Sequence, residues 1–280
     1  MPVTLNERIA NFYDQSTKIW LDTWGEHMHH GYYSRNEIAP ASHQEAQVRL
    51  VTEMLKWGKV ESADRILDAG CGVGGSARFL AKLFDANVLG CTLSPVQADY
   101  GNEYSKKAGL SAQVLIKAKD MMSLSLEDGP FDLIWSMESA EHIKDKPALL
   151  ELFYSLLKPG GTLLLATWYH RLEPPMLQIN EQKLLDRIYD YYHLPPMVSI
   201  PVLKDMAMDA GFMQVQSENW SEQVAPFWKA VIRSALTLNS IQGLLKAGWP
   251  TIKGAWAMRY MTKGYKMGLI QFGVLQGKKL

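Results

Sequence analysis

The chain has 280 residues with 47% hydrophobic content, which is enough to bury the core of one catalytic-sized domain. Lysine plus arginine and aspartate plus glutamate both number 29, so no net field would attract nucleic acid, which we exclude as a partner. Cys71 and Cys91 form no CxxC pattern, and no signal segment or run of about 18 apolar residues occurs, which argues against a disulfide scaffold, secretion and a membrane span.

The residue pattern predicts alternating strands and helices in the middle of the chain. After an expected helix near residues 7–20, apolar runs bounded by turn residues predict strands, which fall at 63–70, 86–94, 111–120, 131–137 and 162–170. Helices are expected within 71–84, 95–109 and 146–157, with Gly109 as a C-cap and the KPGG segment ending the last one. This alternation favours a mostly parallel, doubly wound α/β sheet.

The turn DAGCGVGG after the first of these strands carries the first chemical signal. Gly70 and Gly72 lack a β-carbon, so a ligand can lie against the backbone at a helix N-terminus. Asp68 precedes the first glycine by two residues, where a carboxylate would meet an ammonium group but repel a pyrophosphate. The Lys-Ser/Thr pair of a phosphate loop is also missing. We therefore predict a site for S-adenosylmethionine (SAM); the alternative is a turn needed only for close packing.

The next two strands end in side chains that suit the rest of this cofactor. A ribose-binding fold usually offers an acid about 20 residues after the glycines, yet 86–98 contain no Asp or Glu. Thr92 and Gln97 can supply a hydroxyl and an amide in its place. At the end of the third strand, Asp120 can accept from an adenine amino group while Met121 packs on the ring. Alternatively, Asp120 only caps a turn and Met121 is core.

The segment HMHHGYY, residues 27–33, raises the question of a metal site. His27 and His29 can share one face of an extended chain, but His30 cannot join them without a turn at Gly31. No other cluster with ligand spacing supplies a fourth group, so we predict no metal. We interpret this segment and the N-terminal helix as a lid over the cofactor; the alternative is that the histidines are core or surface residues.

Six segments form a set that runs through most of the chain. They are ILDAGCGVGG, GCTLSPVQ, FDLIWSMESAEH, LKPGGTLLLATW, NWSEQVAPFW and KGYKMGLIQFG. Together they resemble the SAM-dependent methyltransferases of the gamma-tocopherol C-methyltransferase group, and the likeness extends from about Phe12 to the C-terminus. The first and fourth segments occur in many methyltransferases. FYD…WGEHMHHGYY, ESAEH and WSEQVAPFW lie outside the shared cofactor core and are more diagnostic.

The resemblance implies a Rossmann-like class I methyltransferase fold, with a mostly parallel seven-stranded sheet and helices on both faces. It implies one domain over 1–280, in which 1–60 form a helical lid, 61–170 the SAM-binding core, and 171–280 a helical substrate cap with the final strands. In related methyltransferases, an N-terminal Tyr-Ser pair lies near the methionine end of SAM. The further residues that we assign to SAM are Tyr33, Ser34, Cys71, Leu93, Ser136 and Met137.

The chemistry of the group suggests where the catalytic residues lie. Related enzymes methylate prenylated benzoquinols, and one branch methylates alkaloid nitrogens. Methylation of an aromatic carbon needs an electron-rich ring, which removal of the proton from a phenol ortho to that carbon provides. His142 follows the fourth strand, at the edge where ligands bind, and we predict it as the base or as a substrate-orienting group. Glu138 and Glu141 would orient its imidazole or serve as base; alternatively, His142 only caps a helix.

The acceptor is expected to be an apolar aromatic small molecule. From Pro195 onward the chain is rich in large apolar side chains, about half of which helical spacing explains as core. Following the resemblance, the candidates for a prenyl tunnel and ring platform are His30, Tyr169, His170, Trp220, Phe227 and Trp228. Five basic residues follow in the C-terminal part of the chain: Lys246, Lys253, Arg259, Lys263 and Lys266. They form either a solvated face or a contact with a membrane surface that holds a lipid substrate.

Two positions depart from the pattern of the group and leave the acceptor open. Ala140 stands where ESGEH has glycine, and Tyr169 stands where cysteine precedes the histidine. We expect C-methylation of a tocopherol-like phenol, with N-methylation of an indole-type alkaloid, methylation of a phytyl benzoquinol, or non-catalytic SAM binding as alternatives. Plant members begin with a plastid transit segment that is absent here, so the expected location is the cytoplasm or a membrane surface, or the plastid for a trimmed plant protein. The oligomeric state is not predicted.

Overall fold

A seven-stranded sheet in the order β3-β2-β1-β4-β5-β7-β6 forms the centre of the molecule. The computed structural model describes residues 4–33, 42–228 and 249–280. The strands are β1 (Arg65–Ala69), β2 (Asn87–Thr92), β3 (Val114–Ala118), β4 (Phe131–Met137), β5 (Leu157–His170), β6 (Met213–Asn219) and β7 (Ile270–Lys278). Strands β1 to β5 pair in parallel, and β7 runs antiparallel to both β5 and β6. The mostly parallel seven-stranded sheet is therefore confirmed.

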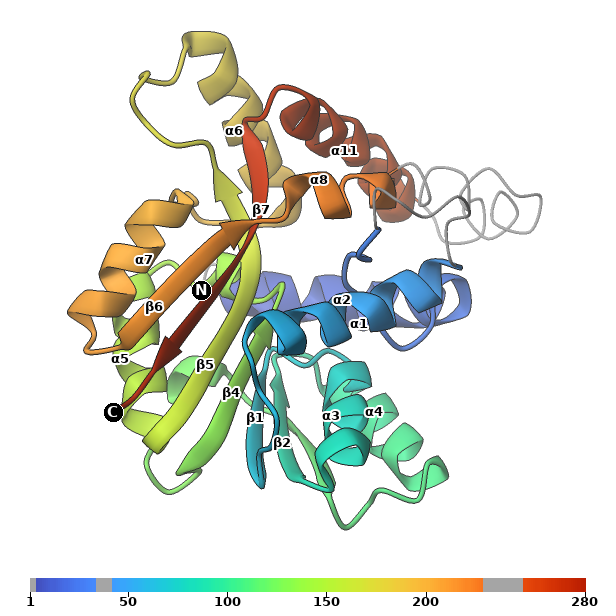
Figure 1. The fold of residues 1–280 in the computed structure, drawn as a ribbon. Coiled ribbons are helices and arrows are strands. Elements are labelled where there is room, and N and C mark those ends of the chain that lie inside the picture. Colours follow the sequence, from blue (N-terminus) through green and yellow to red (C-terminus); the bar gives the residue numbers. More distant parts are fainter. Residues whose placement is uncertain (1–3, 34–41, 229–248) are drawn as a thin grey trace.

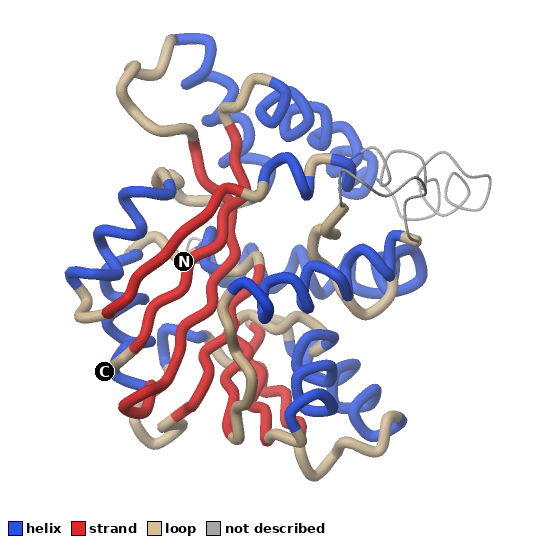
Figure 2. Tube along the Cα trace, in the orientation of Figure 1, coloured by secondary structure: helices blue, strands red, loops and turns tan. Residues whose placement is uncertain are grey.

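Helices cover both faces of this sheet (Figure 1), and the strands run between them in Figure 2. The described helices are α1 (Leu5–Trp24), α2 (His43–Trp57), α3 (Gly75–Phe84), α4 (Pro95–Lys107), α5 (Lys146–Leu156), α6 (Ile179–Tyr192), α7 (Ile200–Asp209), α8 (Ser221–Val224) and α11 (Trp249–Lys266), with 3₁₀ turns η1 (Met121–Ser123) and η2 (Ala140–His142). Figure 1 shows α6, α8 and α11 grouped near one end of β5 and β7, and α1 and α2 lying between this group and α3 and α4.

Local hydrogen bonds explain where these helices begin. Thr4 and Glu7 form a capping box at the start of α1, and Ser42 and Glu45 form another at the start of α2. The N-terminal helix is consequently longer at both ends than the predicted 7–20. Two other predicted helix ends need correction. Helix α5 stops at Leu156 and the KPGG segment already belongs to β5, whereas the C-cap of α4 is the residue before Gly109.

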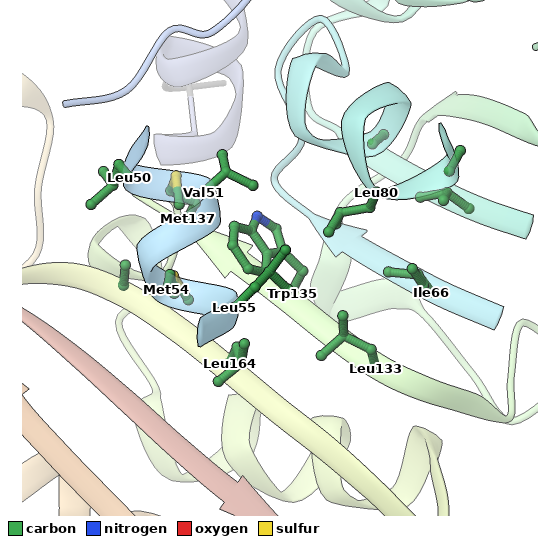
Figure 3. Packing of buried hydrophobic residues seen from close by; sticks show 14 of the residues in the cluster. Leu50, Val51, Met54, Leu55, Ile66, Leu80, Leu133, Trp135, Met137 and Leu164 are labelled. Atoms are coloured by element: carbon green, nitrogen blue, oxygen red, sulfur yellow. The ribbon is translucent and has the colours of Figure 1, made fainter. Parts of the chain in front are cut away.

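Alternation along the central strands separates two apolar cores. Leu133, Trp135 and Met137 of β4 face α2 and α3, where they pack with Leu50 and Met54 (Figure 3). Side chains at the intervening positions face α5 and α7. Because the central strands β1 and β4 are buried on both faces, this part of the sheet is rigid, and the residues that follow its carboxyl ends are held in fixed positions.

Candidate active site

The carboxyl ends of β1, β2 and β4 border a pocket that α1 and the loop after it also line. Gly70 opens the turn after β1 with φ +80°, and a β-carbon there would lie 2.1 Å from the β-carbon of Ser139. The amides of Gly70 and Cys71 both donate to the carbonyl of Cys91, which ties the turn to β2. The turn therefore requires glycine, and Cys71 and Gly72 line the pocket with it.

Asp68 is 2% exposed and lines the same pocket. Its Oδ2 atom is buried without a hydrogen-bond partner among the described residues. Burial raises the pKa of Asp68 to about 7, against smaller opposing effects from an Ala77 backbone hydrogen bond and the charge of Arg78. A buried carboxylate with one free oxygen is a suitable acceptor for an ammonium group.

The end of β2 presents the hydroxyl and the amide that the sequence suggested. The Thr92 hydroxyl donates to Oε1 of Gln97 at 2.7 Å, and both buried side chains line the pocket, as does Leu93. Ser94 caps α4 by accepting from the backbone amide of Gln97 at 3.0 Å, and its hydroxyl donates to the carboxylate of Asp14 in α1. A carboxylate thus reaches this strand from the N-terminal helix, which the spacing along β2 could not reveal.

Asp120 and Met121 line the pocket at the end of β3. Oδ1 of Asp120 accepts from the amide of Met122 at 2.9 Å and so caps η1, while Oδ2 accepts from the side chain of Asn6 at 2.7 Å. Met121 is 9% exposed and packs in the core on the α5 side of the sheet. The turn-cap alternative therefore describes this structure, and a role toward adenine stays a prediction.

His142 reaches the pocket from η2, just beyond β4. Its ring lies edge-on to that of Tyr13 in α1, with centroids 6.4 Å apart. Burial lowers the pKa of His142 to about 4, although a backbone hydrogen bond with His193 acts in the opposite direction. Its Nδ1 atom has no hydrogen-bond partner among the described residues. The histidine thus enters the site as a neutral imidazole at neutral pH.

Glu141, which we expected to orient that imidazole, faces elsewhere. It is 2% exposed and accepts from the Thr167 hydroxyl at 2.7 Å. Burial, with the charge of Glu138 adding to it, raises the pKa of Glu141 to about 7. Among the described residues neither Glu138 nor Glu141 forms a hydrogen bond with His142. The predicted orienting contact is therefore absent from this structure.

Glu138 instead binds His30 across 108 positions of sequence. Its Oε1 accepts from the backbone N–H of His30 at 2.7 Å, and its Oε2 accepts from Nδ1 of the ring at 2.7 Å. Glu138 has a left-handed φ of +52°, which a residue with a β-carbon adopts only where surrounding contacts enforce it. The His30 side chain is 1% exposed. This pair fastens the HMHHGYY segment to the end of β4.

The other two histidines of HMHHGYY lie together. His27 Nδ1 is 3.2 Å from Nε2 of His29, and His29 Nδ1 donates to the carbonyl of His30 at 2.8 Å. Burial lowers the pKa of His27 to about 4 and that of His29 to about 3. Within residues 4–33, 42–228 and 249–280, no three His, Cys, Asp or Glu side chains are arranged to hold a metal ion.

An ion pair anchors Glu26, the residue before this segment, to α3. Arg78 of α3 is 4% exposed, and its Nε donates to Glu26 at 2.9 Å. The same guanidinium donates to the backbone carbonyls of Val73 and Gly101. Together with α1, which lines the pocket through Ile9 and Tyr13, the segment lies over the glycine turn in the manner expected of a lid.

Aromatic rings from several distant elements surround His30. Its ring centroid is 4.0 Å from that of Phe227, 5.2 Å from Trp228, and 5.8 Å from Trp168. Phe272 of β7 and Tyr265 of α11 complete this aromatic cluster at 5.5 and 6.3 Å. Glu138 is thus shared between the pocket, which it lines, and this cluster, which holds its partner His30.

The geometry of the pocket fits SAM. Asp68 offers an unpartnered oxygen for an ammonium group, the glycine turn leaves no room for a β-carbon, and polar side chains follow three successive strands. The basic side chain at its edge, Lys119, is paired with Asp128 at 2.8 Å, so the pocket lacks a free cation for phosphates among its described lining residues.

Comparison with known proteins decides the family. The model of the mycolic acid cyclopropane synthetase family matches residues 3–231. The chain is 43% identical to a probable chloroplastic tocopherol O-methyltransferase of Oryza sativa subsp. japonica over 99% of this chain and 79% of that protein. It is 38% identical to the chloroplastic tocopherol O-methyltransferase of Arabidopsis thaliana, over 98% and 82% respectively. The chain is a SAM-dependent methyltransferase of the tocopherol methyltransferase group.

Solved structures agree with this fold. A mycolic acid cyclopropane synthase complexed with S-adenosylhomocysteine has a TM-score of 0.85 at 19% identity, with 98% of both chains covered. The geranyl diphosphate C-methyltransferase from Streptomyces coelicolor has a TM-score of 0.79 at 19% identity, with 100% of both chains covered. The predicted class I methyltransferase architecture is therefore confirmed for this member of the tocopherol methyltransferase group.

Tyr169 was predicted to contact the acceptor, but its side chain lies on the face of the sheet opposite the aromatic cluster. It is fully buried and shares the face of Leu163 and Leu165, which pack toward α5 and α7. Side chains alternate along β5, so Trp168, one position earlier, points into the aromatic cluster instead. His170 is only partly buried and its Nδ1 donates to the carbonyl of Arg171 at 2.6 Å.

Two more predicted residues lie outside the pocket. Trp220 packs against Tyr32 and Trp57, with ring centroids 5.2 and 6.0 Å away, so it belongs to the core on the α2 side. The Tyr33 hydroxyl lies 3.2 Å from Nδ1 of His43, on the side of the aromatic cluster rather than in the pocket wall. Ser34 lies outside the described residues.

Other residues line the pocket without having been predicted individually. Of the two β4 residues assigned to SAM, Met137 lines the pocket. Ser136 does not, because it is fully buried, and its hydroxyl lies 2.9 Å from the hydroxyl of Ser139. Ser139 lines the pocket instead. The additional lining residues include Ile9, Tyr13, Glu26, His27, Met28 and His29. The lid interpretation was the signal that could have found them, because all six come from the N-terminal helix or the HMHHGYY region.

Proposed function

We propose that this methyltransferase transfers the methyl group of SAM to a ring carbon of a prenylated phenol such as gamma-tocopherol. The observation that carries the proposal is the aromatic cluster beside Glu138, in a chain that is 43% identical over nearly its whole length to a probable tocopherol O-methyltransferase. Stacked and edge-on aromatic side chains suit an aromatic ring with an apolar tail. A relative from Synechocystis, 30% identical over 97% of this chain, is a 2-methyl-6-phytyl-1,4-hydroquinone methyltransferase.

The residues around the pocket have distinct tasks in this proposal. Bound SAM supplies an electrophilic methyl group on a sulfonium centre. Asp68 binds its ammonium group, Thr92 and Gln97 reach the hydroxyls, and Asp120 and Met121 face the adenine. The chain itself holds the phenol carbon in line with the methyl group and excludes water, which is the larger part of the catalysis.

A turnover assay tests this function. S-adenosylhomocysteine release is measured with gamma-tocopherol, delta-tocopherol, a phytyl benzoquinol and a set of indole amines, and the methylated position is located by mass spectrometry. We expect methyl transfer to a tocopherol ring carbon. Activity confined to amines would overturn the proposal. It would instead indicate N-methylation, the reaction in the name of the norajmaline N-methyltransferase of Rauvolfia serpentina, which is 27% identical to this chain.

We further propose that the enzyme takes its substrate from a membrane surface, in a plastid if its location follows that of the plant relatives. The segment that connects β5 to α6, together with the first residue of α6, exposes Leu172, Met176 and Ile179 by 50%, 76% and 76%. Lys263 and Lys266 lie in the last turn of α11, which packs beside α6. Of the other predicted basic residues, Lys246 lies outside the described residues. Among the described helices none is long and apolar enough to cross a membrane.

The double substitution Met176→Ser and Ile179→Ser tests this contact. We expect reduced co-sedimentation with vesicles of neutral and anionic lipid, and a lower rate with vesicle-embedded tocopherol but an unchanged rate with detergent-dispersed tocopherol. Val202→Ser, at a side chain that is 41% exposed on α7 away from this segment, is the control. Equal vesicle binding by all variants would contradict the proposed contact.

A further inference from the structure

The tautomer of His30 is determined by its partner. A carboxylate oxygen only accepts hydrogen bonds, so Nδ1 of His30, at 2.7 Å from Oε2 of Glu138, carries a proton. A neutral imidazole then has its lone pair on Nε2. That atom is buried and without a hydrogen-bond partner among the described residues. His30 is therefore oriented as a proton acceptor, with the carboxylate placed to stabilise the imidazolium that forms.

The position of this pair connects the two parts of the site. Glu138 lines the cofactor pocket between Met137 and Ser139, while the ring of His30 lies within the aromatic cluster. Both oxygens of Glu138 are used by His30, since Oε1 accepts its backbone N–H. A phenol bound among these rings would have its hydroxyl beside Nε2 and its ring next to the pocket. The rings must part to admit it, because they close Nε2 off from solvent here.

The rival candidates lack this arrangement. His142 has no carboxylate partner among the described residues, and its ring faces Tyr13 of α1 rather than the aromatic cluster. Glu141 does not line the pocket, and the hydroxyl of Thr167 occupies one of its oxygens. His30 alone combines a fixed proton on one nitrogen, an open lone pair on the other, and aromatic surroundings, within the described part of the chain.

We propose that His30 is the catalytic base of the methyl transfer and that Glu138 is its positioning residue. The inference rests on the proposed phenol methylation. Nε2 of His30 takes the phenol proton, and the oxygen electron pair moves into the ring. The ortho carbon then bonds to the methyl carbon as the carbon–sulfur bond breaks, with its electron pair left on sulfur. The displaced ring proton leaves to solvent, and His30 returns its proton to the phenolate oxygen.

His30→Gln and His30→Ala test the base. With gamma-tocopherol we expect kcat to fall by roughly 10²–10⁴-fold, the usual contribution of a general base, with the Kd for SAM within about twofold of the original. Added imidazole should restore part of the activity of His30→Ala, which a purely structural role would not permit. His142→Gln is the matched comparison and should lose less than about tenfold.

Glu138→Gln and Glu141→Gln test whether Glu138 positions His30 or only contributes to packing. Glutamine keeps the size of Glu138 but cannot accept from both donors of His30 or stabilise its charge, so we expect kcat to fall by roughly 10–100-fold with little change in KM. Glu141→Gln should change kcat by less than about threefold. Thermal unfolding and SAM binding of each variant confirm that it is folded.

The outcomes separate this inference from the function on which it depends. If the original enzyme methylates no phenol, the proposed function fails first. If it methylates tocopherol and His30→Gln keeps full kcat, or if His142→Gln loses more activity than His30→Gln, the assignment of the base to His30 is wrong. Loss in His30→Ala without imidazole rescue, together with weakened SAM binding, would make His30 a structural residue and would equally overturn the proposal.

Discussion

Asp68 illustrates how a binding residue can oppose stability. Its carboxyl group is buried with one unpartnered oxygen, and burial raises its pKa to about 7, so the free protein holds this group uncharged below that pH. In the unfolded chain the group ionises near its ordinary value. The folded state therefore binds the proton more tightly, and the contribution of Asp68 to stability falls as pH rises from about 4 to 7. Binding of an ammonium group favours the ionised form instead.

The substitution Asp68→Asn should separate these two effects. We expect the SAM affinity to fall at least about tenfold, because a charge-assisted hydrogen bond is lost. The unliganded variant should be more stable than the original at pH 8, because no buried charge remains. Calorimetric titration with SAM and thermal unfolding at pH 8 measure both, and lower stability of the variant would contradict the argument.

At the scale of elements, the site at the strand ends is completed by segments that do not belong to the sheet. Helix α1 and the HMHHGYY segment cover the glycine turn, and the contacts that fasten them include Arg78 to Glu26 and Glu138 to His30. In the first contact the Glu26 side chain is 47% exposed. Arg78 is buried, and it also donates to two backbone carbonyls. Loss of the arginine should therefore lower the free energy of unfolding more than loss of the glutamate.

Arg78→Met and Glu26→Gln test this asymmetry. Removal of the arginine takes one donor from each of the carbonyls of Val73 and Gly101, so we expect unfolding to become easier by roughly 2–4 kcal/mol. Glu26→Gln should cost less than about 1 kcal/mol, since its side chain is half exposed. Denaturant unfolding gives both values, and a raised KM for SAM is expected for Arg78→Met. Equal losses in both variants would contradict the prediction.

At the scale of the whole molecule, buried titratable groups should set the acid stability. Burial lowers the pKa of four histidines to about 3 or 4, namely His27, His29, His43 and His142. Burial raises the pKa of two carboxyl groups to about 7, Asp68 and Glu141. Between about pH 4.5 and 6.5 the unfolded chain protonates the four histidines while the folded chain keeps two carboxyl protons, so unfolding takes up a net of up to two protons.

Stability should consequently rise with pH across this window and fall as acid is added. A net uptake of about two protons corresponds to a slope of roughly 2–3 kcal/mol per pH unit. Thermal unfolding between pH 4.5 and 8 checks the sign, and His43→Gln should make the dependence shallower. A stability that is flat from pH 4.5 to 6.5 would show that the carboxyl groups cancel the histidines, and one that decreases would show that they outweigh them; either result contradicts the prediction.

The sequence by itself determined the alternation of strands and helices, the glycine turn with Asp68, and the family, because each depends on neighbours in the chain: apolar period, turn residues and motif spacing. Only the tertiary structure decided what crosses between elements. Alternation along β5 put Trp168 rather than Tyr169 in the aromatic cluster, and the partner of Glu138 proved to be His30 instead of nearby His142. Such pairings depend on how a lid packs over a sheet edge, and local spacing carries no information about contacts made 108 residues apart.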